Sequence, residues 1–256
     1  MAPDRPLETG WLPDTPVDDN LLRSFGASQG EVNARWADAS GGRFEDSTAV
    51  ALSDTGGQIP YFNQAFLQRP LVGLDDEVLD HADRFYEGVD RPVSLLSMWP
   101  TPDLTARGWR LEGHPMLVAR GPWGGDPRRP GDDAIVRDVG HDDVATFERV
   151  FVEGYPMPGG TIPAGLLDRG VTLRLGVVGG EPVAAAAGFV GSGIVNLCGA
   201  ATLPAARRTG AWGALVRARM ADAPDLPALA YTSDFSRPGF VHMGFLPITR
   251  FTIWLR

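Results

Sequence analysis

The sequence contains no lysine, a single cysteine and only four histidines. Cys198 has no partner for an internal disulfide and cannot build a cysteine-based metal site. The four histidines show no spacing typical of metal ligands. We therefore expect a protein that binds no metal.

Long apolar runs are also missing. A stretch such as "PVAAAAGFVG" is far shorter than the roughly 20 residues needed to span a bilayer, and the N-terminus "MAPDRPLETG" has no basic-then-apolar signal pattern. The formal net charge of -9 argues against a general nucleic-acid binder, because the phosphate backbone requires a basic surface. We expect a soluble cytoplasmic protein, a monomer or homodimer, that acts on small molecules and not on membranes or nucleic acids.

A Pro- and Gly-rich charged stretch, "GPWGGDPRRPGDD" at 121–133, is the clearest boundary in the 256 residues. It predicts two lobes, 1–122 and 133–256. The first forty or so residues hold two short amphipathic pieces, around Leu21 to Phe25 and around Val32 to Trp36. The rest of the first half has the pattern strand, strand, helix, strand, short helix, strand.

The second half has a similar order. After a strand and a helix near 141–156, three strands follow, then a helix near 209–222 and a strand, a short helix and a final strand. Both halves end with helix, strand, short helix, strand, which predicts two copies of one lobe. The expected fold class is α+β, with a mostly antiparallel twisted sheet flanked by helices in each lobe.

The stretch "AARRTGA" at 205–211 stands between a strand and a helix. Free backbone N–H groups at a helix start, with the positive end of the helix dipole, form a place where phosphate binds. Arg207 and Arg208 add positive charge, and Gly210 lets the backbone approach a ligand closely. The stretch is neither a Walker loop nor a dinucleotide fingerprint. A solvated basic turn is the alternative interpretation.

These residues carry a resemblance. Residues 134–256 resemble the GNAT superfamily of acyl-CoA-dependent N-acyltransferases, whose hallmark is a strand, a (Q/R)-x-x-G-x-(G/A) loop and a helix. Arg207 and Gly210 stand in the first and fourth places of that loop, while Trp212 departs from the pattern in the sixth. The Gly244-Phe245 pair is similar to the pair that follows the family's last helix. Residues 45–120 resemble a degenerate copy without the loop, so the whole resembles a tandem member.

The resemblance implies acetyl-CoA as the acyl donor. The pyrophosphate would bind the amides of about 207–212, and the pantetheine arm would lie along the exposed edge of a strand. We interpret Trp212 as a core residue of the helix whose indole points away from the ligand. The implied cofactor-binding residues are Ala200, Ala201, Thr202, Arg207, Arg208, Thr209, Gly210, Ala211 and Trp212.

In the family an amine attacks the thioester directly, and a tyrosine is the usual acid for the leaving thiolate. Phe240 stands at that place here. Ser236 is the preferred substitute, although it is also a candidate helix N-cap; His242 or Tyr231 are alternatives, or the thiolate leaves unaided because a thiol pKa is near 8.5. Asp234 and Glu153 are candidate bases acting through water. Cys198 is interpreted as a buried small hydrophobe.

The acceptor pocket is expected near "EGYPMPGG" at 153–160. Apolar side chains there favour a small or hydrophobic amine, and the acidic balance favours a cationic one. The expected pocket residues are Phe151, Tyr155 and Met157, with Phe62 and Asn63 as walls from the first lobe.

Three functions remain open: an N-acetyltransferase for a small amine, a non-catalytic acyl-CoA-binding or regulatory protein, and a tandem-lobe aminoacyltransferase using charged tRNA. The acidic charge disfavours the third. The first lobe is expected to hold no cofactor, because its helix starts with Asp75, Asp76 and Glu77, which would repel a phosphate.

Overall fold

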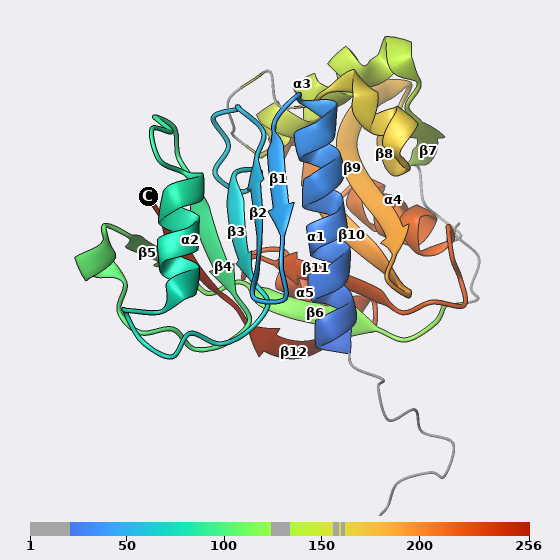
Figure 1. The fold of residues 1–256 in the computed structure, drawn as a ribbon. Helices are drawn as coiled ribbons and strands as arrows, with labels where there is room; N and C mark the ends of the chain where they lie inside the picture. The colour runs from blue at the N-terminus through green and yellow to red at the C-terminus, as the bar shows by residue number, and fades with distance from the viewer. Residues whose placement is uncertain (1–20, 124–133, 156–158, 160–161) are drawn as a thin grey trace, which may run out of the picture.

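The computed structural model describes residues 21–123, 134–155, 159 and 162–256, which form two sheets on either side of a long helix (Figure 1). The first sheet has the strand order β1-β2-β3-β4-β13-β5. Its strands are β1 (Arg43–Asp46), β2 (Val50–Asp54), β3 (Gln64–Leu67), β4 (Ser94–Ser97), β13 (Thr252–Leu255) and β5 (Arg110–Gly113).

The second sheet has the order β12-β6-β11-β10-β9-β8-β7. Its strands are β12 (Leu246–Arg250), β6 (Met116–Arg120), β11 (Ala228–Thr232), β10 (Ile194–Thr202), β9 (Glu181–Gly191), β8 (Val171–Val178) and β7 (Ile135–Asp138). The helices are α1 (Leu21–Ala39), α2 (Glu77–Phe85), α3 (Val144–Gly154), α4 (Ala211–Met220) and α5 (Arg237–His242), with short 3-10 turns at 105–107, 141–143, 164–169 and 204–206.

Both sheets are mostly antiparallel, which confirms the α+β class expected from the sequence. Each sheet contains one parallel pair, β3 with β4 and β10 with β11. A helix joins the two strands of each parallel pair, α2 in the first sheet and α4 in the second. The repeated order of elements read from the sequence is therefore present as two β-α-β units.

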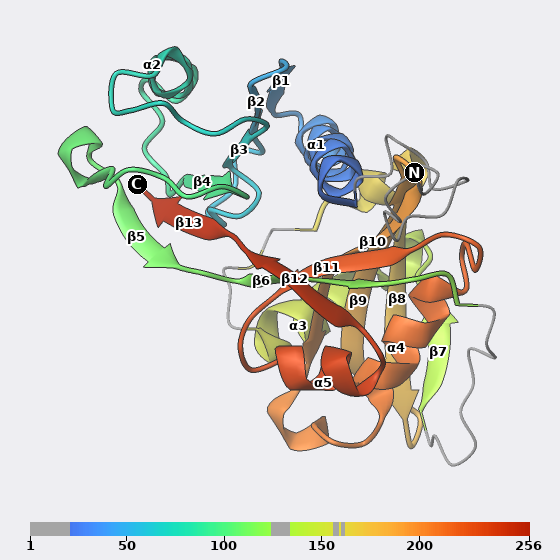
Figure 2. The ribbon, with the colours of Figure 1, turned by 90° about the horizontal axis from the view of Figure 1, so that it is seen from below.

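The two sheets do not coincide with the two halves of the sequence. Strand β6 precedes the predicted boundary but lies between β12 and β11, while β13 lies in the first sheet between β4 and β5. The segments 109–120 and 245–255, each expected to be one strand, are both split between the sheets. Figure 2 shows them as two long ribbons that cross. The crossing is fastened where the Phe251 N–H donates to the Pro115 carbonyl at 2.9 Å.

The N-terminal segment forms one continuous helix, not two short pieces. Gly26 and Gly30 lie within α1, and they suggest a break in the sequence because glycine disfavours helices. In the fold they allow close packing. A Cβ on Gly26 would lie 3.4 Å from side-chain atoms of Met98 and Phe66. Helix α1 thus packs closely on the first sheet while its later residues reach the second.

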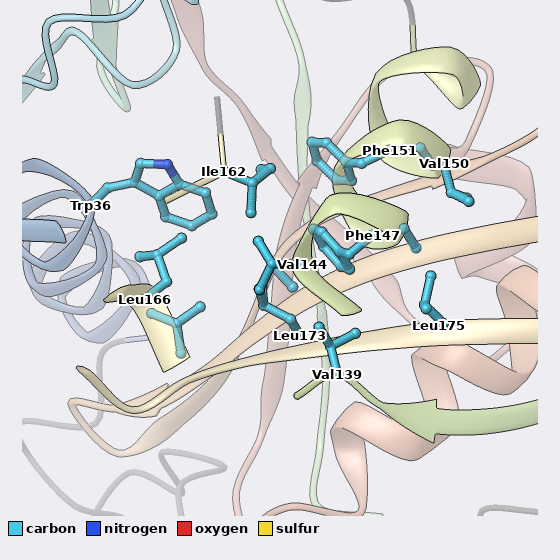
Figure 3. Packing of buried hydrophobic residues seen from close by; sticks show 14 of the residues in the cluster. Trp36, Val139, Val144, Phe147, Val150, Phe151, Ile162, Leu166, Leu173 and Leu175 are labelled. Atoms are coloured by element: carbon cyan, nitrogen blue, oxygen red, sulfur yellow. The ribbon is translucent and has the colours of Figure 1, made fainter. Parts of the chain in front are cut away.

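The largest apolar cluster joins α1 to the second sheet (Figure 3). Trp36 of α1 and Leu166 belong to the same cluster as the apolar face of α3, where Val144, Phe147, Val150 and Phe151 are buried. The interior beneath α3 is therefore shared by the first and second halves of the chain. Within the described residues, no helix combines the length and apolar character of a membrane span, and no group of three His, Cys, Asp or Glu side chains has the arrangement of a metal site.

Candidate active site

The parallel strands β10 and β11 pair only at their beginnings. Val195 and Asn196 face Ala228 and Leu229, and beyond this point the strands diverge. The register between β10 and β9 shifts between Asn196 and Gly199, so that β10 carries a bulge at the point of divergence. A cleft of about 700 Å³ opens there, lined by Leu197 to Ala200 from β10 and by Ala230 to Thr232 from β11. The edge of β10 beyond the bulge is free to pair with an extended ligand.

Helix α4 begins close to the end of β10. Its N-cap is Gly210, with a φ of 88°, and it makes no side-chain capping hydrogen bond. Among the described residues, the first backbone bond of the helix runs from the Ala214 N–H to the Gly210 carbonyl at 2.9 Å. The Arg207 N–H donates to the Pro204 carbonyl, and the amides from Arg208 to Gly213 are left to a ligand or solvent, which is the arrangement that binds phosphate.

The loop before α4 has an unusual backbone. Arg208 has a φ of 69°, a region that residues other than glycine rarely occupy. The Thr209 hydroxyl holds the turn by donating to the Ala206 carbonyl at 2.8 Å. The side chains of Arg207 and Arg208 are exposed. The predicted phosphate loop thus presents two cations and an uncapped helix start on one surface.

Trp212 has two roles. Its ring meets Phe240 edge to face at a centroid distance of 4.8 Å, as part of an apolar cluster between α4, α5 and the sheet. It also lines the cleft. Gly239 accommodates the indole, because a Cβ there would lie 2.9 Å from it. Trp212 is therefore a half-buried residue that packs on the core, but its indole does not point away from the cleft as the sequence predicted.

Three hydroxyl groups gather where β11 ends. Ser236 lies directly before α5, and its hydroxyl bonds those of Thr232 and Ser233, the latter at 3.1 Å. It makes no side-chain capping bond to α5. All three residues line the cleft. A linked set of hydroxyls can pass a proton, which a phenyl ring at Phe240 cannot.

Asp234 lies at the same rim. Its carboxylate is exposed and accepts a hydrogen bond from Arg250 at 2.9 Å. That bond holds the pKa of Asp234 below its usual range. The group is therefore ionised at neutral pH and is a weak base, better suited to attracting a cationic amine than to taking its proton.

The opposite wall of the cleft is aromatic. Tyr61, Phe62, Phe151, Tyr155 and Tyr231 line it. Phe62 stacks on Trp36 of α1 at a centroid distance of 4.5 Å. Burial raises the pKa of Tyr61 to about 12 and also raises the pKa of Tyr231. Both phenols are neutral hydrogen-bonding groups at physiological pH.

Some predicted site residues lie elsewhere. Asn63 is fully buried in the first lobe, where its side-chain N–H groups donate to the Gly57 and Pro92 carbonyls at 2.8 and 3.1 Å and its oxygen accepts from Thr55. It does not line the cleft, because its amide is used to hold a loop. Glu153 is exposed on α3 beside Arg149, at 3.7 Å, and is also outside the cleft.

His242 is exposed at the end of α5 and does not line the cleft. Of the cofactor residues assigned to β10, Ala200 lines the cleft, while Ala201 is buried against α3, where Gly154 leaves room for it. Thr202 ends the strand beside the same glycine. Met157 lies outside the described residues.

Cys198 lies in the bulge and faces the α3 side of the sheet. Burial raises the pKa of its thiol to about 12, and the thiol donates to the Asn196 carbonyl at 3.4 Å. A protonated thiol is a poor nucleophile. The residue therefore packs as a small apolar group, although it is half-buried and also lines the cleft.

Sequence reasoning missed several residues of the cleft, among them Tyr61, Thr232 and Ser233. Glu112 and His114 reach it from the first half of the chain, through the segment that crosses between the sheets. No local pattern signals this. Arg219 of α4 also lines the cleft although it is only 1% exposed. It was detectable, since it falls on the same helical stripe as Leu215, Val216 and Met220.

The fold is that of the GCN5-related N-acetyltransferases. A solved structure described by that name from Kribbella flavida is 17% identical, with a TM-score of 0.66 over 92% of this chain and 95% of that one. A putative GNAT-family acetyltransferase from Novosphingobium aromaticivorans is 20% identical, with a TM-score of 0.59 over 94% and 98%. A third, from Sphaerobacter thermophilus, is 12% identical, with a TM-score of 0.55 over 90% and 93%. No family model and no curated protein sequence matches the chain.

Proposed function

We propose that this protein transfers an acyl group from acyl-CoA, with acetyl-CoA as the expected donor, to the amine of a small molecule by direct attack on the thioester. One observation carries the proposal. The uncapped start of α4, with Arg207 and Arg208 beside it, stands at the end of the free edge of β10 and next to the cleft. An extended, amide-rich ligand with a pyrophosphate at one end matches this combination.

The donor is assigned to the side of the cleft formed by α4 and α5. The amides of 208–212 bind the pyrophosphate beside the Arg207 side chain, and the pantetheine arm pairs with the edge of β10 at Ala200 to Thr202. The thioester then lies at the bulge, where the backbone N–H groups of β10 are available to stabilise the developing oxyanion. Trp212 forms an apolar wall beside the arm.

The acceptor is assigned to the aromatic side. Phe62, Phe151 and Tyr155 offer apolar surface, while Glu112 and Asp234 supply negative charge at the rim. This favours an amine with an apolar body. Ser236, linked to Thr232 and Ser233, is the proposed route for the proton that the leaving thiolate takes up.

A non-catalytic acyl-CoA-binding protein is the second candidate, and Phe240 favours it. The ring is buried between Trp212 and Phe245 and offers no proton where the family has a tyrosine. A thiolate leaves without an acid more readily than an alkoxide, because a thiol pKa is near 8.5, so this residue alone does not decide between the two candidates.

Two measurements separate the candidates. Calorimetry with acetyl-CoA and with free adenosine 3',5'-bisphosphate tests donor binding, and a thiol-release assay across a panel of aliphatic and aromatic amines tests transfer. The enzyme proposal expects binding with micromolar Kd and amine-dependent release of free CoA. Binding of acetyl-CoA without release of free CoA in the presence of any amine favours the non-catalytic candidate. If acetyl-CoA does not bind, both candidates are wrong.

A further inference from the structure

Arg219 is the largest polar side chain buried in the described part of the protein. Its Nε donates to the Leu215 carbonyl at 3.1 Å, one turn earlier in α4. Its Nη1 donates to the carbonyls of Ala187 and Gly199, at 2.9 and 3.2 Å. These two residues face each other across β9 and β10 at the bulge. The guanidinium is thus fixed beneath the floor of the cleft.

The second terminal nitrogen is different. Arg219 Nη2 is buried and has no hydrogen-bond partner among the described residues, and no carboxylate forms an ion pair with Arg219 there. The titratable groups around it are Cys198, Arg174 and Asp222. Asp222 is bound to Arg174 through two hydrogen bonds, at 2.8 and 2.7 Å, so it does not neutralise Arg219.

The fold makes room for this side chain. A Cβ on Gly188 of β9 would lie 3.1 and 3.2 Å from the Cδ and Cγ of Arg219, so that a side chain there would crowd Arg219. Burial lowers the pKa of Arg219 to about 10, which still leaves it protonated at neutral pH. Burying a cation without a counter-ion is energetically unfavourable, and an anion brought by a ligand offsets much of that penalty.

We propose that Arg219 Nη2 binds a carboxylate that a substrate carries to the floor of the cleft. This rests on the proposed function and names its substrate class. The floor lies at the divergence of β10 and β11, beside the bulge assigned to the thioester. The favoured source is therefore the far end of a dicarboxylic acyl group on CoA. An amino-acid acceptor is the other source of the same chemistry.

The donor source is tested on the wild-type protein with two CoA thioesters of equal chain length. Calorimetry with glutaryl-CoA and pentanoyl-CoA is expected to give at least about tenfold tighter binding of glutaryl-CoA, because a charge-assisted hydrogen bond replaces an unmet one. The acceptor source is tested by thiol release with phenylalanine and with phenethylamine, which differ by the carboxylate. A preference for the carboxylate in either pair supports the proposal, and a preference in neither overturns it.

Variants locate the effect. In Arg219→Gln the carboxylate preference is expected to fall to less than about twofold, while Arg217→Gln, on the same helix, keeps it. Arg219→Lys retains the cation and is expected to retain part of the preference. Thermal unfolding of each variant checks the fold. A preference that persists in folded Arg219→Gln overturns the assignment to this residue.

Failure of the proposed function has a separate signature. If no CoA thioester binds the wild-type protein, the proposed acyl transfer is wrong. The carboxylate site is then tested by comparing the thermal shifts that glutarate and 1,5-pentanediol produce. Stabilisation by glutarate that Arg219→Gln abolishes supports the carboxylate site on its own. Equal shifts with the two compounds overturn it.

Discussion

The two β-α-β units of this protein begin their helices in opposite ways. At α2 the Asp76 side chain, fully buried, accepts hydrogen bonds from the N–H groups of Val72 and Val78 at 2.9 and 3.0 Å. Arg69 holds the same carboxylate through two bonds of 2.8 Å. At α4 the corresponding place has Gly210, no side-chain cap and two exposed arginines.

The two parallel strands of each unit also differ in how far they stay paired. Strands β3 and β4 stay paired from Gln64 to Phe66, whereas β10 and β11 separate after two pairs and leave the cleft. In the first unit Asp76 caps the helix and the two parallel strands stay paired. In the second unit the helix amides have no side-chain cap and the two strands separate. The comparison shows that the two helix starts differ by a single buried carboxylate, which caps α2 and is absent from α4.

The largest expected effect comes from making the open unit resemble the closed one. Replacing Arg207 by Glu and Gly210 by Asp places negative charge at the proposed pyrophosphate site. We expect the affinity for acetyl-CoA to fall at least about a hundredfold, or roughly 2.7 kcal/mol. Calorimetry measures the change, and the far-ultraviolet dichroism spectrum should stay that of the wild type.

Gly179→Asp is the matched control for this pair. Gly179 also has a positive φ, 59°, and a Cβ there meets nothing within 4 Å. The control places an acid at another glycine of positive φ away from the cleft, so acetyl-CoA affinity should not change. Undiminished affinity in the double variant would remove the main support for the CoA site.

Removing the anion from the closed unit is expected to affect stability. Asp76→Asn loses the ion pair with Arg69 and weakens the cap, which we expect to lower the free energy of unfolding by about 2–3 kcal/mol at pH 7. Chemical denaturation measures this. Asp75→Asn, next in the chain but outside the network, should change stability by less than about 0.5 kcal/mol.

The pH dependence of that difference has a definite sign. The Arg69 hydrogen bond lowers the pKa of Asp76 in the folded state, so its stabilisation is complete above the unfolded value near 3.8 and is lost as the pH falls below it. The gap between wild type and Asp76→Asn should therefore narrow in acid. A gap that is constant from pH 7 to pH 3 would mean that the charge of Asp76 does not matter.

A smaller effect concerns one serine near the end of the second parallel strand of each unit. Ser236→Ala should lower turnover about tenfold with acetyl-CoA affinity unchanged, because it removes a proton carrier but no binding contact. Ser97, at the end of β4, bonds the backbone of Trp99 instead, at 2.8 Å, and Ser97→Ala should leave turnover unaffected. Equal loss in both variants would indicate a structural effect only.

Glu153→Gln sharpens the same comparison. Glu153 was a candidate base on the sequence, but its carboxylate lies outside the cleft. We expect less than a twofold change in turnover. A larger decrease, measured with saturating donor and acceptor, would return Glu153 to the mechanism.

Local patterns predicted much of the fold. The order of strands and helices around α2 and α4, and the loop before α4, depend on residues close in sequence, so that periodicity and turn chemistry reveal them. The uncapped start of α4 could also be predicted, because the N-cap residue is Gly210 and not a Ser, Asp or Asn whose side chain would accept from the helix N–H groups.

The division of strands between sheets was not readable. The segments 109–120 and 245–255 each have one uninterrupted strand-like pattern, and nothing local says which sheet a strand joins. Pro115 and Phe251 mark the crossing only once their hydrogen bond is known. The prediction that Asn63 lines the cleft was wrong for a related reason. The side chain of an Asn in a loop can bond nearby backbone groups as readily as it can face a ligand.

The exchange of β6 and β13 has a consequence for the order in which the chain folds. The first sheet is made mostly from residues 43–113, yet β13, between β4 and β5, comes from residues 252–255. During synthesis, β13 is not available to pair with β4 and β5 until the ribosome has added these last residues. Trp254 completes the apolar cluster of that sheet at the same moment. Folding of the first sheet therefore waits for the second, and the two are expected to unfold in one cooperative transition.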